Sequence, residues 1–151
     1  MKTRVREAKL VYKGRGRESV QITTPEHIYQ FIKRDLGDAT TEQFIVLLLN
    51  NKNYIIGWTE VSKGSISESL VHPREVFATA IHSLASSVII VHNHPSGSLV
   101  PSREDLSTTK RIYDASKIIG IELLDHLIIS NDGFYSFKEH NQIGEVVEDG
   151  E

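Results

Sequence analysis

The sequence predicts an α/β protein with a mixed β-sheet flanked by helices. Continuous apolar runs at residues 44–49 and 88–91 are typical of buried strands, and they alternate with segments that have the apolar spacing of helices. A strand–helix–strand order over residues 88–130 predicts a parallel crossover. Turn sequences at residues 50–53 and 131–133 predict antiparallel hairpins. A sheet with both kinds of connection is mixed.

The composition limits the possible functions. The chain has 151 residues with 39% hydrophobic and 25% charged residues, an ordinary balance for one globular domain. It has no cysteine, so disulfides are excluded and any metal must be held by histidines and carboxylates. A net charge of −3 does not favour a dedicated nucleic-acid-binding domain. Without a long apolar run or a secretory signal, we expect a cytoplasmic protein with no membrane partner.

The N-terminal part is expected to contain one or two strands within residues 1–24, around a glycine-rich turn at 14–16. Thr24 and Pro25 then indicate the start of a helix, with Thr24 as the N-cap and proline at the first helical position. Gly37 is the expected end of this helix.

The middle of the chain begins with the strand at 44–49, which should be buried on both faces. Residues 54–61 should return antiparallel to it. Residues 62–71 are polar and rich in serine, and we expect a connection with a short strand. A second helix should begin after His72, with a core face made of Val76, Phe77, Ala80, Ile81 and Leu84.

The C-terminal part should form a helix from about residue 102 to 119, followed by a strand at 121–130. The turn at 131–133 then leads into a returning strand at 134–137. We expect three regions: N-terminal strands or an arm at 1–22, the main domain at 23–140, and an acidic tail at 141–151 that should be frayed over residues 145–151.

The strongest functional signal lies between His92 and Asp105. Side chains two apart on a strand point to the same side, so His92 and His94 should face together if the strand continues past residue 91. Asp105 is a candidate third ligand. Three protein ligands with one open position are typical of a catalytic zinc site.

The loop between these ligands contains Pro95, Gly97 and Pro101, which should form a stiff bend that folds the next helix back toward the strand end. Ser102 and Asp105 have the spacing of an ordinary helix capping box. The two interpretations are compatible, because a carboxylate in the first turn of a helix is free to act as a ligand as well.

Other families with a His-x-His metal site fit less well. Amidohydrolase barrels need roughly 250 residues, and zinc deaminases need cysteines that this chain lacks. Metallo-β-lactamase folds need further Asp and His ligands directly after the motif, where this chain has Pro95 and Ser96.

The pattern His92-x-His94-Pro, followed by Ser102-x-x-Asp105, resembles the metal motif of the JAB/MPN (JAMM) metalloprotease family. The strings His-Asn-His-Pro-Ser-Gly and Pro-Ser-Arg-Glu-Asp-Leu are similar to the RadC branch of that family, as are the segments at 72–75, 125–126 and 135–137. The resemblance covers roughly residues 20–140. It implies the JAB/MPN (cytidine deaminase-like) architecture, here as a short single-domain variant without the helical region that usually precedes this domain.

The resemblance also implies roles for five residues. His92, His94 and Asp105 would be the ligands of one zinc ion per chain, with water at the fourth position. Glu42, just before the strand at 44–49, would be the general base, and Ser102 would stabilise the oxyanion. His72, Asp125 and His126 are further candidates that would orient the ligands.

By this resemblance the chain would be a zinc-dependent metallopeptidase or isopeptidase that uses zinc-activated water on a peptide or isopeptide substrate. The alternative is a DNA-repair-associated, RadC-like accessory module that contacts nucleic acid, or a nuclease, because metal-activated water also attacks phosphate. A purely structural role ranks last, because every ligand is present. The sequence does not indicate an oligomeric state.

Overall fold

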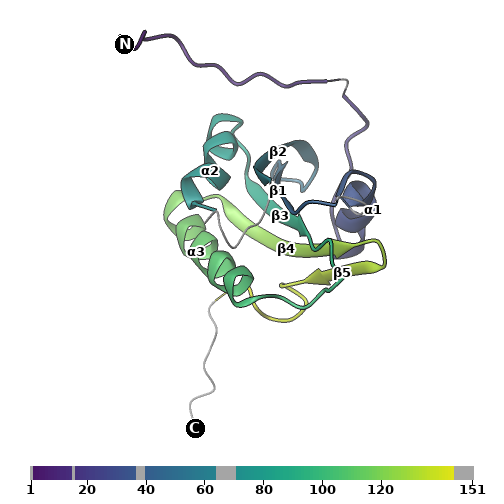
Figure 1. Cartoon of the computed structure of the whole chain (residues 1–151). Helices are drawn as coiled ribbons and strands as arrows, with labels where there is room; N and C mark the ends of the chain where they lie inside the picture. Colours follow the sequence, from purple (N-terminus) through teal and green to yellow (C-terminus); the bar gives the residue numbers. More distant parts are fainter. Residues whose placement is uncertain (1, 15, 37–39, 64–70, 145–151) are drawn as a thin grey trace.

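A computed structural model describes residues 2–14, 16–36, 40–63 and 71–144. Within them, a five-stranded sheet in the order β2-β1-β3-β4-β5 separates helix α1 from helices α2 and α3 (Figure 1). This architecture confirms the predicted α/β class with a mixed sheet. The elements are α1 (Pro25–Leu36), β1 (Gln43–Leu49), β2 (Ile55–Lys63), α2 (Pro73–His82), β3 (Ser87–Asn93), α3 (Arg103–Ile119), β4 (Glu122–Ser130) and β5 (Gly133–Ser136).

Strand β3 is buried along its whole length and has a hydrophobic core on each side. Its side chains alternate between the two faces. Val88 and Ile90 pack into the core formed with α2 and α3, whereas Ile89 and Val91 pack into the core formed with α1. His92 follows in this alternation, so its imidazole lies on the face covered by α3.

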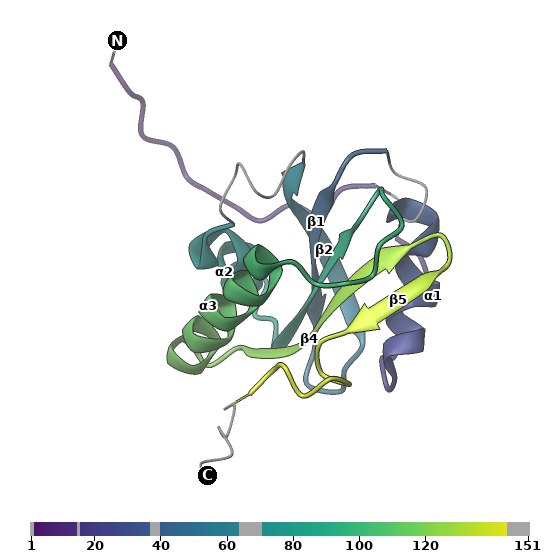
Figure 2. The same cartoon turned by 60° about the horizontal axis from the view of Figure 1, so that its bottom comes forward.

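The strand connections bring three chain segments to one edge of the sheet. β1 pairs antiparallel with both β2 and β3, so the start of β1 lies beside the end of β3, with Phe44 opposite His92. β3 and β4 are parallel and are joined through α3. Figure 2 shows the loop after β3 crossing this edge before α3 begins. β5 then returns antiparallel to β4, which confirms the predicted hairpin.

The prediction of strands in residues 1–24 is wrong for the described residues. Residues 2–14 and 16–20 form no strand, and Gln21 makes only an isolated bridge with Tyr54. Among the apolar side chains that suggested strands, Val5 is fully exposed and Tyr12 is 60% exposed, whereas Ile22 is buried in the core on the α1 face of the sheet. A loose alternation of apolar residues does not make a strand without a neighbouring strand to pair with.

The predicted core face of α2 is wrong at its end. Val76, Phe77 and Ala80 are buried as expected, but Ile81 is 52% and Leu84 is 87% exposed. The helix ends at His82, and Leu84 has a left-handed backbone conformation with φ of 56°. Because the helical periodicity stops there, Leu84 no longer shares the buried face.

Three further expectations lie outside the described residues. They are the helix end at Gly37, most of the connection at 62–71, and the frayed tail at 145–151. In the part of the chain that the structure describes, no helix combines the length and the apolar character needed to cross a membrane.

Replacing Leu47 by alanine tests the packing of the interior strands. Leu47 is completely buried in β1, so Leu47→Ala should lower the free energy of unfolding by about 2–5 kcal/mol. Urea unfolding of the variant and the wild type measures the loss. Val11→Ala, at a position 72% exposed, is the control and should change stability by less than about 0.5 kcal/mol. Equal losses in both variants would contradict the described core.

Candidate metal centre

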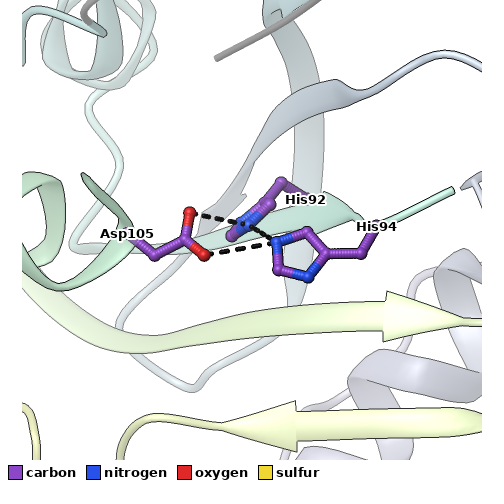
Figure 3. A group of neighbouring side chains, drawn as sticks. All are labelled: His92, His94 and Asp105. Atoms are coloured by element: carbon purple, nitrogen blue, oxygen red, sulfur yellow. Dashed lines mark hydrogen bonds and ion pairs between the residues drawn. The ribbon is translucent and has the colours of Figure 1, made fainter. Parts of the chain in front are cut away.

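Three side chains meet at the edge of the sheet where β3 ends (Figure 3). His92 is the penultimate residue of β3, His94 follows the strand, and Asp105 lies in the first turn of α3. His92 Nε2 lies 3.1 Å from Asp105 Oδ1, and His94 Nε2 lies 3.2 Å from Asp105 Oδ2. The two Nε2 atoms are 3.1 Å apart. In the described part of the chain, this is the one group of three histidine, cysteine or acidic residues placed to share a metal ion.

The separations fit a tetrahedral metal. Neighbouring ligand atoms on a tetrahedron with bonds of about 2.0–2.1 Å are about 3.3 Å apart. The distance between the two Nε2 atoms, and the distance from each Nε2 to its nearer Asp105 oxygen, are close to this value. If both rings are neutral and carry their proton on Nδ1, two nitrogen lone pairs and a carboxylate face one another across this short gap. That arrangement is repulsive unless a cation lies between the two nitrogens and the carboxylate. The ligand set therefore fits a divalent metal ion on both distance and charge.

The site is largely shielded from water. His92 is completely buried and the Asp105 side chain is 5% exposed, while His94 stays partly open at 12%. Burial alone would raise the pKa of Asp105, but the hydrogen bonds with His92 and His94 outweigh it and hold that pKa well below its ordinary value. Asp105 is therefore a carboxylate, and it supplies the negative charge of the site.

His94 is oriented by the loop that follows β3. Its Nδ1 lies 2.8 Å from the carbonyl oxygen of Ser98, which only accepts hydrogen bonds, so Nδ1 carries a proton. The lone pair of the neutral ring is then on Nε2, facing Asp105. The loop turns back at Gly97, whose φ of 83° suits glycine and whose N–H donates to the His94 carbonyl at 2.9 Å.

Asp105 is held by the capping box of α3. The Ser102 hydroxyl accepts from the Asp105 N–H at 3.0 Å, and Asp105 Oδ2 accepts from the Ser102 N–H at 2.8 Å. This reciprocal pair satisfies two helix-end donors and fixes the carboxylate at the same time. The predicted capping box is therefore present, and the same carboxylate faces both histidines.

Glu42 is brought close to the histidines by β1, the strand that pairs with β3. It directly precedes β1, whose pairing sets Phe44 opposite His92. Asn93 fixes this segment, since its Oδ1 accepts from the Gln43 N–H at 2.7 Å and its Nδ2 donates to the Thr41 carbonyl at 3.1 Å. The hydrogen bond with Asp105 raises the pKa of His94 against the effect of burial, and the negative charge of Glu42 adds to that rise. Glu42 as a residue is half-buried.

The three residues suggested as orienting groups lie in different places. His126 contacts the site, with Nε2 2.7 Å from His92 Nδ1. Asp125 instead accepts from the Ser136 hydroxyl and from the backbone N–H groups of His126 and Lys138, and burial raises its pKa against these bonds. His72 is the N-cap of α2, where its Nδ1 accepts from the Arg74 N–H.

Two residues near the site gave no clear sequence signal. Asn93 lies between the two histidines in sequence, but its side chain hydrogen-bonds to the backbone on either side of Glu42. Thr109 is one turn after Asp105 in α3, and its hydroxyl contacts both the Asp105 carbonyl and His126. Only the spacing of four residues from Asp105 could have singled out Thr109, because that spacing puts both on one face of a helix.

Comparison with known proteins identifies the family of this chain. The RadC-like JAB domain family matches residues 22–142. A UPF0758 protein of Pelobacter propionicus is 44% identical over 129 residues, which are 85% of this chain and 56% of that protein. The UPF0758 protein STH371 of Symbiobacterium thermophilum is 48% identical over 120 residues, covering 80% of this chain and 51% of that protein.

The UPF0758 protein CA_C1241 of Clostridium acetobutylicum is 48% identical over 122 residues, covering 81% of this chain and 53% of its own length. The chain thus spans about half the length of the relatives it matches. Of the described residues, the matched region contains strands β1 to β5, helices α1 to α3 and the His92–His94–Asp105 group. On this evidence, the chain belongs to the RadC-like JAB domain family.

Proposed function

We propose that this domain is a zinc-dependent hydrolase of the JAMM type that cleaves a peptide or isopeptide bond. The observation that carries the proposal is the convergence of two imidazole nitrogens and a carboxylate within 3.2 Å of one another, in a buried site. His92, His94 and Asp105 would hold the zinc ion. Three ligands leave a fourth position for water, as catalytic rather than structural zinc sites do.

A bound zinc ion would supply Lewis acidity and lower the pKa of a coordinated water to about 7. Glu42 is the candidate general base. Glu42 directly precedes β1, whereas the two histidines come from the end of β3 and Asp105 from the start of α3. Glu42 is therefore separate from the three candidate ligands. A carboxylate oxygen there would accept the proton of the attacking water and return it to the leaving amine.

Ser102 is the candidate for stabilising the oxyanion. Its hydroxyl oxygen accepts from the Asp105 N–H, and this contact leaves the hydroxyl proton for another acceptor. That proton would be donated to the carbonyl oxygen of the substrate as negative charge develops on it. Capping the helix fixes the position of the hydroxyl, so its two roles support each other.

Metal content tests the ligand assignment. Protein made with zinc in the medium and purified without chelators should contain about one zinc per chain by elemental analysis. His92→Ala and Asp105→Ala should lose it, because each removes one of three ligands. His82→Ala, which removes an exposed histidine in the last turn of α2, is the control and should keep the zinc. Wild-type protein that stays free of metal under these conditions would contradict the proposal.

The general base is tested by Glu42→Gln, which removes the charge and keeps the shape. The variant should retain zinc but cleave about 10²–10⁴-fold more slowly, because the proton acceptor is lost. Cleavage is followed by mass spectrometry on linear and lysine-branched peptide libraries in heavy-oxygen water, which labels each new carboxylate.

The matched control is Glu122→Gln, an exposed glutamate at the start of β4, paired with Ser87 at the opposite end of β3 from His92. It should cleave like the wild type. If zinc-loaded wild-type protein labels no linear or branched peptide, the peptidase function is wrong. If Glu42→Gln cleaves at the wild-type rate, Glu42 is not the base.

A further inference from the structure

A chain of buried hydrogen bonds lies behind His92 and joins three elements of the fold. The Thr109 hydroxyl in α3 lies 2.7 Å from the Asp105 carbonyl oxygen and 2.5 Å from His126 Nδ1 in β4. His126 Nε2 lies 2.7 Å from His92 Nδ1 in β3. Thr109 and His126 are 1% and 0% exposed, so water does not compete for these bonds.

The position of each proton in this chain follows from its first member. A carbonyl oxygen only accepts, so the Thr109 hydroxyl must donate its single proton to the Asp105 carbonyl. The hydroxyl oxygen is then an acceptor toward His126. His126 Nδ1 must therefore carry a proton and donate it to Thr109.

His126 is in surroundings that favour a neutral ring. It is completely buried, its two nitrogens face a hydroxyl and an imidazole, and Phe137 stacks on it with ring centres 4.3 Å apart. A charged imidazole without a carboxylate partner would be costly here. With the proton on Nδ1, the Nε2 of the neutral ring is an acceptor, so His92 Nδ1 must donate to it.

We propose that Thr109 and His126 are positioning residues that keep a proton on Nδ1 of His92 and thereby leave its Nε2 as the electron-pair donor of the site. This inference deepens the proposed function, because it states how one ligand of that same metal centre is prepared. The two histidines then reach the same tautomer by different means. A backbone carbonyl sets His94, whereas side chains set His92, and only the latter can be changed by substitution.

The bonds also tie two ligands together. The chain begins at the backbone carbonyl of Asp105 and ends at His92, whose Nε2 lies 3.1 Å from the Asp105 carboxylate. Without the Thr109 hydroxyl, His126 Nδ1 loses its acceptor. The other tautomer of His126 would then donate from Nε2 to His92 Nδ1 and place the His92 proton on Nε2, where it would block metal binding.

The test uses Thr109→Val, which keeps the shape of the side chain and removes the hydroxyl. Its zinc affinity, measured by competition with a chromophoric chelator, should fall about 10–100-fold. Thr109→Ser restores the hydroxyl and should bind nearly as the wild type does. Thr108→Val is the matched control, since Thr108 is a neighbouring buried threonine on α3, and it should leave the affinity unchanged.

Nitrogen NMR of the imidazole rings in the metal-free proteins gives a readout that does not depend on zinc or activity. The wild type should show a proton on Nδ1 of both His92 and His126, and Thr109→Val should lose that pattern. A wild-type spectrum without a proton on His92 Nδ1 overturns the inference, even if Thr109→Val fails to fold. So does equal loss of zinc affinity in Thr109→Ser and Thr109→Val, because packing rather than the hydroxyl would then be responsible.

The two proposals fail in different ways. Wild-type protein that binds no zinc would end the proposed hydrolase, while the NMR pattern would still decide the roles of Thr109 and His126. Wild-type protein that binds zinc, together with a Thr109→Val variant of unchanged affinity and unchanged NMR pattern, would end only the further inference.

Discussion

The structure depends on the meeting of Asp105 with two imidazole nitrogens at the end of a buried strand. Removing a carboxylate from water is costly unless it is paired and hydrogen-bonded. The Ser102 N–H donates to Oδ2 of Asp105, and a cation shared with His92 Nε2 and His94 Nε2 would complete the pairing. The site is thus a concentrated negative charge in a place of low water access, which is the electrostatic requirement for holding a small cation.

The mixed sheet explains why these groups meet. An antiparallel neighbour places its start beside the end of β3, and this brings Glu42 and the segment held by Asn93 to the histidines. A parallel neighbour requires a crossover helix, and the start of that helix returns to the same edge with Asp105. If β1 were parallel to β3, Glu42 would lie at the opposite end of β3 from His92. If β4 were antiparallel to β3, no crossover helix would be needed to bring Asp105 to the histidines.

Much of this was predictable from local sequence, and the rest depended on tertiary register. The strands at 44–49 and 88–91 are continuous apolar runs, and Pro25 and Pro73 lie at helix starts, so short windows were sufficient for them. The grouping of His92, His94 and Asp105 was predictable because the three residues are close in sequence. The strands expected in residues 1–24 were wrong because a strand needs a partner, and no short window contains one.

The residues that contact the candidate ligands were harder to predict from local sequence. His126 was suggested only by resemblance, and Thr109 is an ordinary polar residue on a helix until α3 is laid across β4. Asn93 has two histidines as sequence neighbours, yet its side chain hydrogen-bonds to the backbone at the start of β1. Contacts between helices and strands decide these roles, so the spacing of residues along one helix or strand does not reveal them.

The capping box and the contacts with the two histidines use the same Asp105 carboxylate without competing for it. A carboxylate has about four lone-pair sites, and the bond from the Ser102 N–H to Oδ2 uses one of them. Oδ1 remains directed at His92 and Oδ2 at His94. The cap therefore orients the carboxylate without exhausting it, and the helix N-terminus favours its negative charge. An aspartate at this position stabilises the start of α3 by the same bonds that aim it at the histidines.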